Sequence, residues 1–238
     1  MPLNMYRFTV LILLLLVVST PGYSQNTSPQ FIAFPASLQS QWRYSLGLTF
    51  TTTPHEITEE THISIPAIDF QILKSAGSNF TFDAHLLSQI LQNHASVGFR
   101  WLHPLSDKFS LSAGDEMAGW MGWIQIETMN TRAYGILNYP NVSIGYKFDE
   151  KLLLSLKAEL LLNFHQQFFV GKQEVEKNPE AYSGEAFTIA LEQPFFNGTW
   201  VTLKFKAMYS NFFWQAWSLF ENYDRNLFYP QVTAAFIL

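Results

Sequence analysis

The amino-acid sequence predicts an all-β protein, an up-and-down antiparallel β-barrel of about ten strands. Apolar and polar residues alternate with a two-residue period in ten segments of the chain, which is typical of strands with two different faces. Short polar turns alternate with mostly longer connections between these segments. An up-and-down barrel shows this alternation of short and long connections when both chain ends lie on the short-turn side.

The composition excludes several classes of protein. Of the 238 residues, 16% are aromatic and 14% are charged, which excludes an intrinsically disordered chain. Ordinary soluble domains carry roughly 25% charged residues. A net charge of −5 without a basic cluster argues against binding to nucleic acid. The absence of cysteine excludes disulfides, thiolate metal sites and a cysteine nucleophile.

Residues 1–24 have the pattern of a secretory signal peptide. Arg7 precedes an apolar stretch at 8–18, and the small residues Gly22 and Ser24 precede the predicted cleavage point. An uncleaved anchor is the alternative, but the apolar stretch is shorter than the about 20 residues that cross a bilayer as a helix. Residues 25–40 are predicted to be a flexible polar lead-in, and residues 41–238 a single β-barrel domain.

The segment 152–164 is the most informative of the predicted strands. Seven apolar residues occupy every second position from Leu152 to Phe164. An amphipathic helix also fits part of this pattern, but the alternation of the neighbouring segments favours a strand. Segments 62–73 and 186–193 alternate weakly, so eight or twelve strands remain open. The predicted strands are 42–50, 62–73, 80–90, 95–101, 109–118, 134–148, 152–164, 186–193, 201–209 and 228–238.

The apolar face of these strands is predicted to face lipid. Many of the strands are long enough to cross a bilayer, which takes about 9–11 residues, whereas about 5–6 is common in soluble sheets. An open sheet edge is prohibitively costly in a bilayer, so the sheet must close. A soluble β-sandwich is the alternative, because its strands alternate as well. Aromatic residues near predicted strand ends fit interfacial girdles: Trp42, Tyr44, Trp101, Phe109, Tyr146, Phe148, Trp200 and Tyr229.

The signal peptide, the ten alternating strands, the turn parity and the amphipathic last strand together resemble the bacterial outer-membrane β-barrel proteins. The resemblance covers about residues 42–238, is architectural and singles out no one family. It implies export to the outer membrane of a Gram-negative bacterium, a porin-like shape, and outer-membrane lipids and the barrel-assembly machinery as partners. Such barrels commonly end on an aromatic residue, whereas this chain ends on Leu238.

The polar face of the strands is predicted to line the lumen. Ten strands leave little space inside, because an eight-strand barrel is just filled by side chains. Charges there must be paired or hydrated, so they are interpreted as a network that fills the lumen, with a narrow conduit for small solutes as the alternative. The predicted members are Arg43, Asp69, Asp83, Arg100, Glu116, Lys147, Lys157, Glu159, Glu192, Lys204 and Lys206.

Two connections are rich in aromatic residues. Exposed apolar clusters of this kind mark interfaces or ligand sites, so a protein partner or an apolar ligand at the extracellular loops is one hypothesis. The other is that these side chains simply pack together as a cap. The predicted cap consists of Trp120, Trp123, Phe212, Phe213, Trp214, Trp217, Phe220 and Tyr223.

No catalytic motif stands out, and we predict neither a cofactor nor a metal site. An enzyme with a site at the barrel rim is the alternative, in which Asp115, Glu116 and His94 would converge to activate a water. His85 and His165 are further candidates for that rim. The sequence thus predicts an outer-membrane barrel with a structural, binding or narrow small-solute transport role. A secreted soluble β-sandwich that binds a ligand remains the third alternative.

Overall fold

The computed structural model describes residues 29–38, 42–58, 64–126, 129–175, 180–219 and 225–238. The predicted signal peptide lies outside these residues. Three short helical segments are present in the described part: α2 (His55–Thr58), η1 (Phe196–Gly198) and η2 (Trp214–Leu219). The strands are β1 (Trp42–Thr52), β2 (Ser64–Ser75), β3 (Phe80–Ser88), β4 (Gln92–Pro104), β5 (Phe109–Ile126), β6 (Met129–Lys147), β7 (Leu153–Val170), β8 (Gln173–Val175), β9 (Tyr182–Pro194), β10 (Trp200–Ser210) and β11 (Leu227–Ile237).

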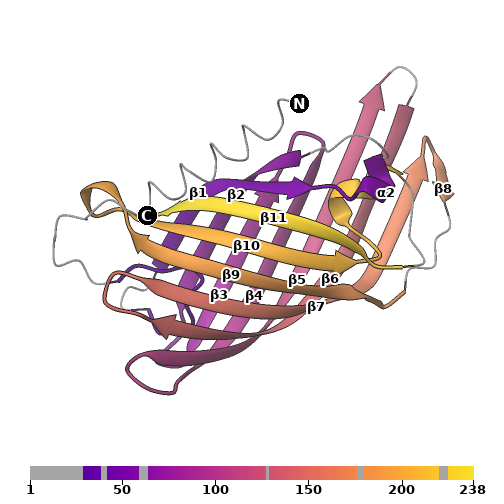
Figure 1. The fold of residues 1–238 in the computed structure, drawn as a ribbon. Helices are drawn as coiled ribbons and strands as arrows, with labels where there is room; N and C mark the ends of the chain where they lie inside the picture. The colour runs from indigo at the N-terminus through magenta and orange to yellow at the C-terminus, as the bar shows by residue number, and fades with distance from the viewer. Residues whose placement is uncertain (1–28, 39–41, 59–63, 127–128, 176–179, 220–224) are drawn as a thin grey trace.

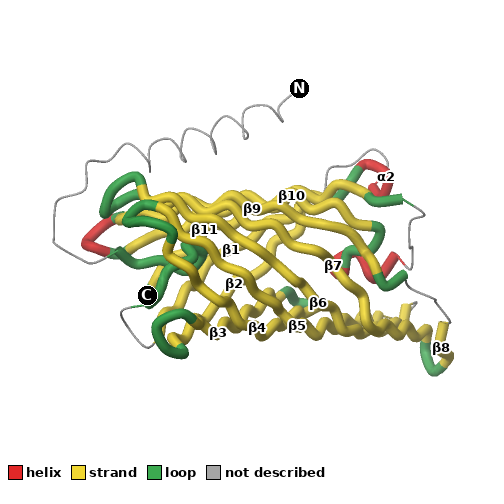
Figure 2. Tube along the Cα trace, turned by 90° about the horizontal axis from the view of Figure 1, so that it is seen from below, coloured by secondary structure: helices red, strands yellow, loops and turns green. Residues whose placement is uncertain are grey.

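Ten of the described strands close into one antiparallel barrel (Figures 1 and 2). Pairing runs from β6 through β1 to β11, β10, β9 and β7, and β6 pairs with β7 to close the ring. The first and last strands meet, with Ser45 opposite Ile237. The strand β8 is a short addition that pairs with β7. The predicted ten-strand up-and-down barrel is therefore confirmed, and the β-sandwich alternative is wrong.

The two ends of the barrel differ in their connections. The turns β2–β3, β4–β5, β6–β7 and β9–β10 lie at one end, together with the start of β1 and the end of β11 (Figure 1). We call this the short-turn end. The opposite end carries α2, β8 and η2, and we call it the loop end (Figure 1).

Three strands run further toward the loop end than the sequence predicts. β5 and β7 have 18 residues each and β6 has 19. Residues 119–126 belong to β5 instead of a loop, because their pairing with β6 continues as far as Ile126 opposite Met129. The predicted segment 152–164 is a strand, β7, and the helical alternative is wrong there. Among the described residues, no helix is long and apolar enough to cross a membrane.

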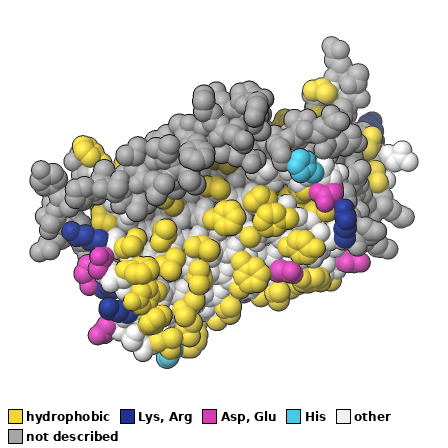
Figure 3. All heavy atoms as spheres, in the orientation of Figure 1, with side chains coloured by type: hydrophobic (Ala, Val, Ile, Leu, Met, Phe, Trp, Pro, Cys, Tyr) yellow, Lys and Arg dark blue, Asp and Glu magenta, His cyan; other side chains and the backbone are white. Residues whose placement is uncertain are grey.

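The outer surface of the barrel is apolar. Along β1 the exposed residues are Trp42, Tyr44, Leu46, Leu48 and Phe50, and the side chains between them face inward. Hydrophobic side chains cover the middle of the face shown in Figure 3, while most charged side chains of that face lie toward its ends. Such a surface on a closed sheet suits contact with lipid.

Only some of the residues predicted for the aromatic girdle are exposed on the outer surface. At the short-turn end Trp42, Trp101 and Phe109 are exposed. Trp200 and Tyr229 are 0% and 1% exposed and face the interior, so their assignment to a girdle is wrong. Both lie on the inward parity of their strands and pack against segments that fill the barrel ends.

Candidate functional site: the barrel lumen

The short-turn end of the lumen is filled by the chain's own N-terminal segment, residues 31–38, which we call the plug segment. Its apolar side chains pack against inward residues of the barrel wall near this end, and Ile32 is fully buried. The described part of the predicted flexible lead-in thus lies inside the barrel, because its side chains are apolar. The packed residues are Phe31, Ile32, Phe34 and Leu38 of the plug segment with Leu73, Leu153, Trp200 and Ile237.

Glu192 on β9 holds the backbone of the plug segment. Its carboxylate accepts three hydrogen bonds, from the N–H groups of Ile32 (2.7 Å), Ala33 (2.9 Å) and Phe34 (2.9 Å). A buried carboxylate is tolerated when such donors satisfy it. The guanidinium of Arg100 donates to the Ile32 carbonyl at 3.3 Å. The plug segment is therefore bound by directed polar contacts as well as by apolar packing.

The loop end of the lumen is filled by η2 and the residues before it. Phe212, Phe213, Trp214 and Trp217 are each at most 7% exposed and belong to one apolar cluster with inward residues of the wall. The indole of Trp214 stacks on the His94 ring at a centroid distance of 5.1 Å. The wall is adapted to this filling, because a Cβ atom at Gly122 would overlap the Trp217 indole.

The predicted aromatic cap is thus mainly an internal structure. Trp120 joins the cluster, and its ring lies 5.5 Å from that of Phe212. Trp123 is 47% exposed and faces outward on β5, so the structure does not bring it to the cap. Phe220 and Tyr223 lie outside the described residues. Of the two hypotheses for these aromatics, packing into a cap fits the five residues that belong to this cluster.

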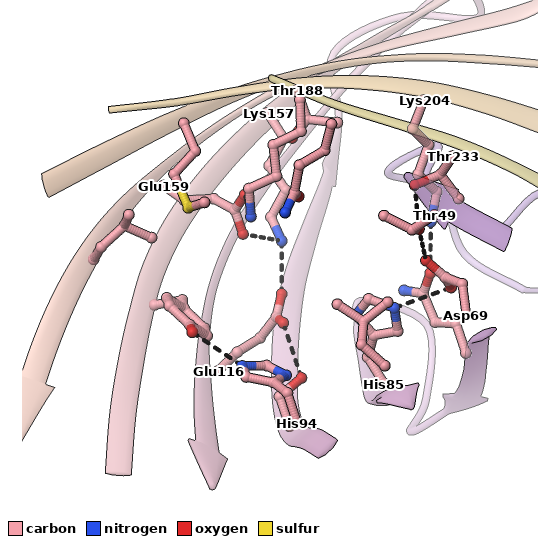
Figure 4. Close-up of a pocket in the computed structure, with 18 of the residues that line it drawn as sticks. Thr49, Asp69, His85, His94, Glu116, Lys157, Glu159, Thr188, Lys204 and Thr233 are labelled. Atoms are coloured by element: carbon pink, nitrogen blue, oxygen red, sulfur yellow. Dashed lines mark hydrogen bonds and ion pairs between the residues drawn. The ribbon is translucent and has the colours of Figure 1, made fainter. Parts of the chain in front are cut away.

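Between the two filled ends, one ionic cluster connects β5, β7 and β10 (Figure 4). The Lys157 ammonium lies 2.6 Å from a Glu116 carboxylate oxygen and 3.0 Å from one of Glu159. The second Glu159 oxygen lies 2.9 Å from the Lys206 ammonium. Each carboxylate therefore has a cationic partner, as a buried charge requires.

A second polar cluster faces the first across the lumen (Figure 4). The Asp69 carboxylate contacts His85 at 3.0 Å and accepts a 2.7 Å hydrogen bond from Thr49. Thr49 also contacts the Thr233 hydroxyl at 2.6 Å. On the adjoining wall, Lys204 donates to the Gln71 amide oxygen at 2.9 Å.

The remaining predicted lumen charges have other surroundings. Arg100 pairs with Asp83 at 2.8 Å, and both side chains are buried. Arg43 lies over the Phe31 ring of the plug segment at 5.8 Å. Lys147 is at the end of β6 and pairs with the exposed Glu150, which places it at the rim and away from the clusters. The alternation of inward and outward residues along β6 does not predict this rim position, because Lys147 is the last residue of the strand.

A cavity of about 150 Å³ lies between the filled ends. Ionic and hydroxyl side chains from both clusters line one part of it, including Lys157, Lys204 and Thr233. Apolar side chains such as Met208 and Phe212 line the part nearer the loop end. Sequence reasoning missed the neutral members of this lining, including Gln71 and Tyr139. Both residues occupy inward positions in the two-residue alternation of their strands, and this alternation could have identified them.

The candidates for catalysis converge only in part: Glu116, His94 and His85 line the lumen cavity, whereas Asp115 does not. Glu116 faces inward and pairs with Lys157, whereas Asp115 faces outward beside Phe99 and accepts a hydrogen bond from Asn138. The two carboxylates lie on opposite faces of β5 because they are adjacent in a strand. His94 contacts the Tyr139 hydroxyl at 3.0 Å.

The other two histidines differ in their surroundings. His85 is committed to Asp69 inside the lumen. His165 lies on the exposed side of β7 near the Tyr134 ring. The rim-enzyme alternative requires Asp115, Glu116 and His94 to converge, and this arrangement is absent because Asp115 faces outward.

Fold and lumen together define a class: a closed antiparallel β-barrel with an apolar exterior, a charged interior and both ends filled by its own chain. No protein-family model matches the sequence, and no curated protein matches it.

Several solved barrel structures are similar in shape. The NanC porin aligns with a TM-score of 0.41 at 8% identity, over 81% of this chain and 98% of the porin. Neisserial surface protein A aligns with a TM-score of 0.35 at 10% identity, over 84% of this chain and 97% of that one. The toluene transporter TodX of P. putida aligns with a TM-score of 0.37 at 10% identity, over 87% of this chain and 73% of that one.

Proposed function

We propose that this protein is an integral β-barrel of the bacterial outer membrane that binds a small ligand in a closed lumen, instead of serving as a permanently open pore. The exposed apolar residues supply the lipid contact, and export by the predicted signal peptide would bring the chain to that membrane. Closed β-barrels and helices are the structures that can span a bilayer without unsatisfied backbone groups.

One observation carries the proposal: the chain fills its own lumen at both ends. The plug segment occupies the short-turn end and η2 occupies the loop end. A water-filled channel needs a continuous polar path, and larger barrels of about 16–18 strands provide one. In this barrel the polar part is the cavity between the two fillings, bounded by paired charges.

The cavity supports a binding role more directly than a purely structural one. A lumen that served stability alone would be filled by side chains, as it is in the smallest barrels. Here about 150 Å³ remains. A narrow transport role would require the plug segment or η2 to move, and such movement would appear as conductance.

Planar-bilayer recording tests this proposal. The purified full-length protein, after export and folding, should insert without steady, large single-channel steps. A variant in which residues 29–38 are replaced by a Gly/Ser sequence of equal length should show larger or more frequent openings, because the short-turn end is then unfilled. Stable large steps from the unaltered protein would contradict the closed lumen.

A further inference from the structure

We propose that the lumen cavity binds a small organic monoanion, with the Lys204 ammonium holding the charge and the apolar part of the cavity holding the body of the ligand. This inference rests on the proposed ligand-binding function and names the class of ligand.

One cation of the cavity wall, Lys204, has no carboxylate in direct contact and interacts with Asp69 and Glu192 only at longer range. Four cationic side chains line the cavity: Arg100, Lys157, Lys204 and Lys206. Arg100 pairs with Asp83, and the other two lysines pair with the carboxylates of the first ionic cluster. Among the described residues, no carboxylate oxygen lies within 4.0 Å of the Lys204 ammonium.

Lys204 also has unused hydrogen-bonding capacity. An ammonium group has three donors and no acceptor, and its partner in the structure is the neutral amide oxygen of Gln71. A carboxylate in the cavity would form a charge-assisted bond with it, roughly twice as strong as a neutral one.

The cavity offers no matching position for a cationic ligand. The carboxylates that line it are Asp69, Glu116 and Glu159. Asp69 contacts His85 and Thr49, and both glutamates contact lysines. A bound cation would have to displace one of these partners, whereas an anion at Lys204 displaces none.

The volume and the apolar lining limit the body of the ligand. Another protein's cavity of about 150 Å³ accepts benzene, so a single ring or a short branched chain fits the volume found here. Inward positions on β10 run from Lys204 through Lys206 to Met208, near the aromatic filling of the loop end. The backbone positions of the first and last lie about 13 Å apart at about 3.3 Å per residue, but the side chains of Lys204 and Met208 line the same cavity, so a ligand held by the ammonium faces the apolar part of the lining.

Calorimetric titration of the folded full-length protein in detergent tests the proposal, with sodium benzoate as the probe and neutral benzamide as its isostere. Benzoate should bind and benzamide should bind at least about tenfold more weakly, since a bond to a charged group contributes about 1.5–3 kcal/mol and 1.4 kcal/mol is tenfold in affinity. Lys204→Gln should weaken benzoate binding to a similar extent. Lys151→Gln, an exposed change in a short turn, should leave it unaltered.

A second variant keeps Lys204 but supplies it with a carboxylate partner from the barrel wall, so that it is no longer available to a ligand. Gln71→Glu places a carboxylate where Lys204 already has its hydrogen-bond partner, so it should weaken benzoate binding even if Lys204→Gln fails to fold. Heat-dependent gel mobility identifies which variants are folded barrels. Absence of benzoate binding to a closed, heat-modifiable barrel would overturn this inference while leaving the closed lumen intact, and so would equal binding of benzamide or full binding by Gln71→Glu.

Discussion

Replacing Glu192 by Gln should loosen the plug segment without emptying the barrel. The carboxylate accepts the backbone N–H groups of Ile32 and Ala33 with one oxygen and that of Phe34 with the other. A glutamine has one acceptor oxygen, and its NH₂ group would face the third N–H donor. The change is isosteric, so the packing of the plug segment is retained.

The cost follows from the three hydrogen bonds. Two of them change from charge-assisted to neutral, a loss of about 1 kcal/mol each. The third N–H is left buried without an acceptor, which costs about 1–3 kcal/mol. The total of about 3–5 kcal/mol acts on the release of the plug segment, and because 1.4 kcal/mol is a factor of ten, release should rise at least about 100-fold.

Thiol labelling measures this release. The chain has no cysteine, so Ala33→Cys introduces a single reporter inside the lumen, where Ala33 lines the cavity. When opening is fast relative to labelling, the rate with a hydrophilic maleimide follows the open population. Asp107→Cys, in an exposed turn, gives the unprotected rate. The control substitution is Glu150→Gln, at an exposed carboxylate on the same end.

The Ala33→Cys reporter should label slowly in the parent barrel and at least about 100-fold faster with Glu192→Gln, while Glu150→Gln leaves the rate unaltered. Two results would refute the reasoning. Equal rates for the Ala33 and Asp107 reporters in the parent would mean that the plug segment is not docked. An unchanged rate with Glu192→Gln would mean that the carboxylate does not hold it.

Three further predictions concern the wall. Lys157→Met leaves two lumen carboxylates without their shared partner and should lower the free energy of unfolding in lipid vesicles by about 3–5 kcal/mol, measured by urea titration; an unchanged midpoint would argue against the ionic cluster. Gly122→Ala should displace the Trp217 ring and shift tryptophan emission; an identical spectrum would contradict the packing of η2. Val97→Arg, at a 64% exposed apolar position, should destabilise the barrel by about 2–4 kcal/mol in a bilayer; a neutral effect would indicate that this face meets water.

The sequence predicted the parts of the fold that depend on strand parity. A two-residue period identifies which side chains share a face, so the outward set of β1 and the inward charges of β7 and β10 follow from local pattern alone. The ten-strand barrel was predicted for the same reason. The same period brings Lys157 and Glu159 together, because they are two residues apart on the inward face of β7.

The fillings of the barrel ends could not be predicted in this way. The plug segment is held by Glu192, about 160 residues further along the chain, and its short apolar sequence has no period that assigns it to a lumen. Phe212, Phe213 and Trp214 were recognised as a cluster, but composition does not distinguish an exposed aromatic surface from one folded inward. Strands at 109–118 and 134–148 are predicted, but their extension toward the loop end is not, because Trp120 and Trp123 are assigned to a loop although they lie on opposite faces of β5.

The Lys204 position shows a further limit. Inward parity predicted this lysine for the lumen, but its lack of an ion pair depends on how the charges of several other strands are matched. That matching is a property of the closed ring, in which Asp69 is taken by His85 and Thr49. This matching of charges can be determined only from the complete barrel.

The mobility of the membrane-fraction protein on a gel, unboiled against boiled, tests the membrane-spanning closed barrel most directly. A barrel closed by the β1–β11 pairing should stay folded in mild detergent and migrate differently until it is heated. Protein recovered in the aqueous fraction, with the same mobility before and after boiling, would contradict the barrel in the membrane.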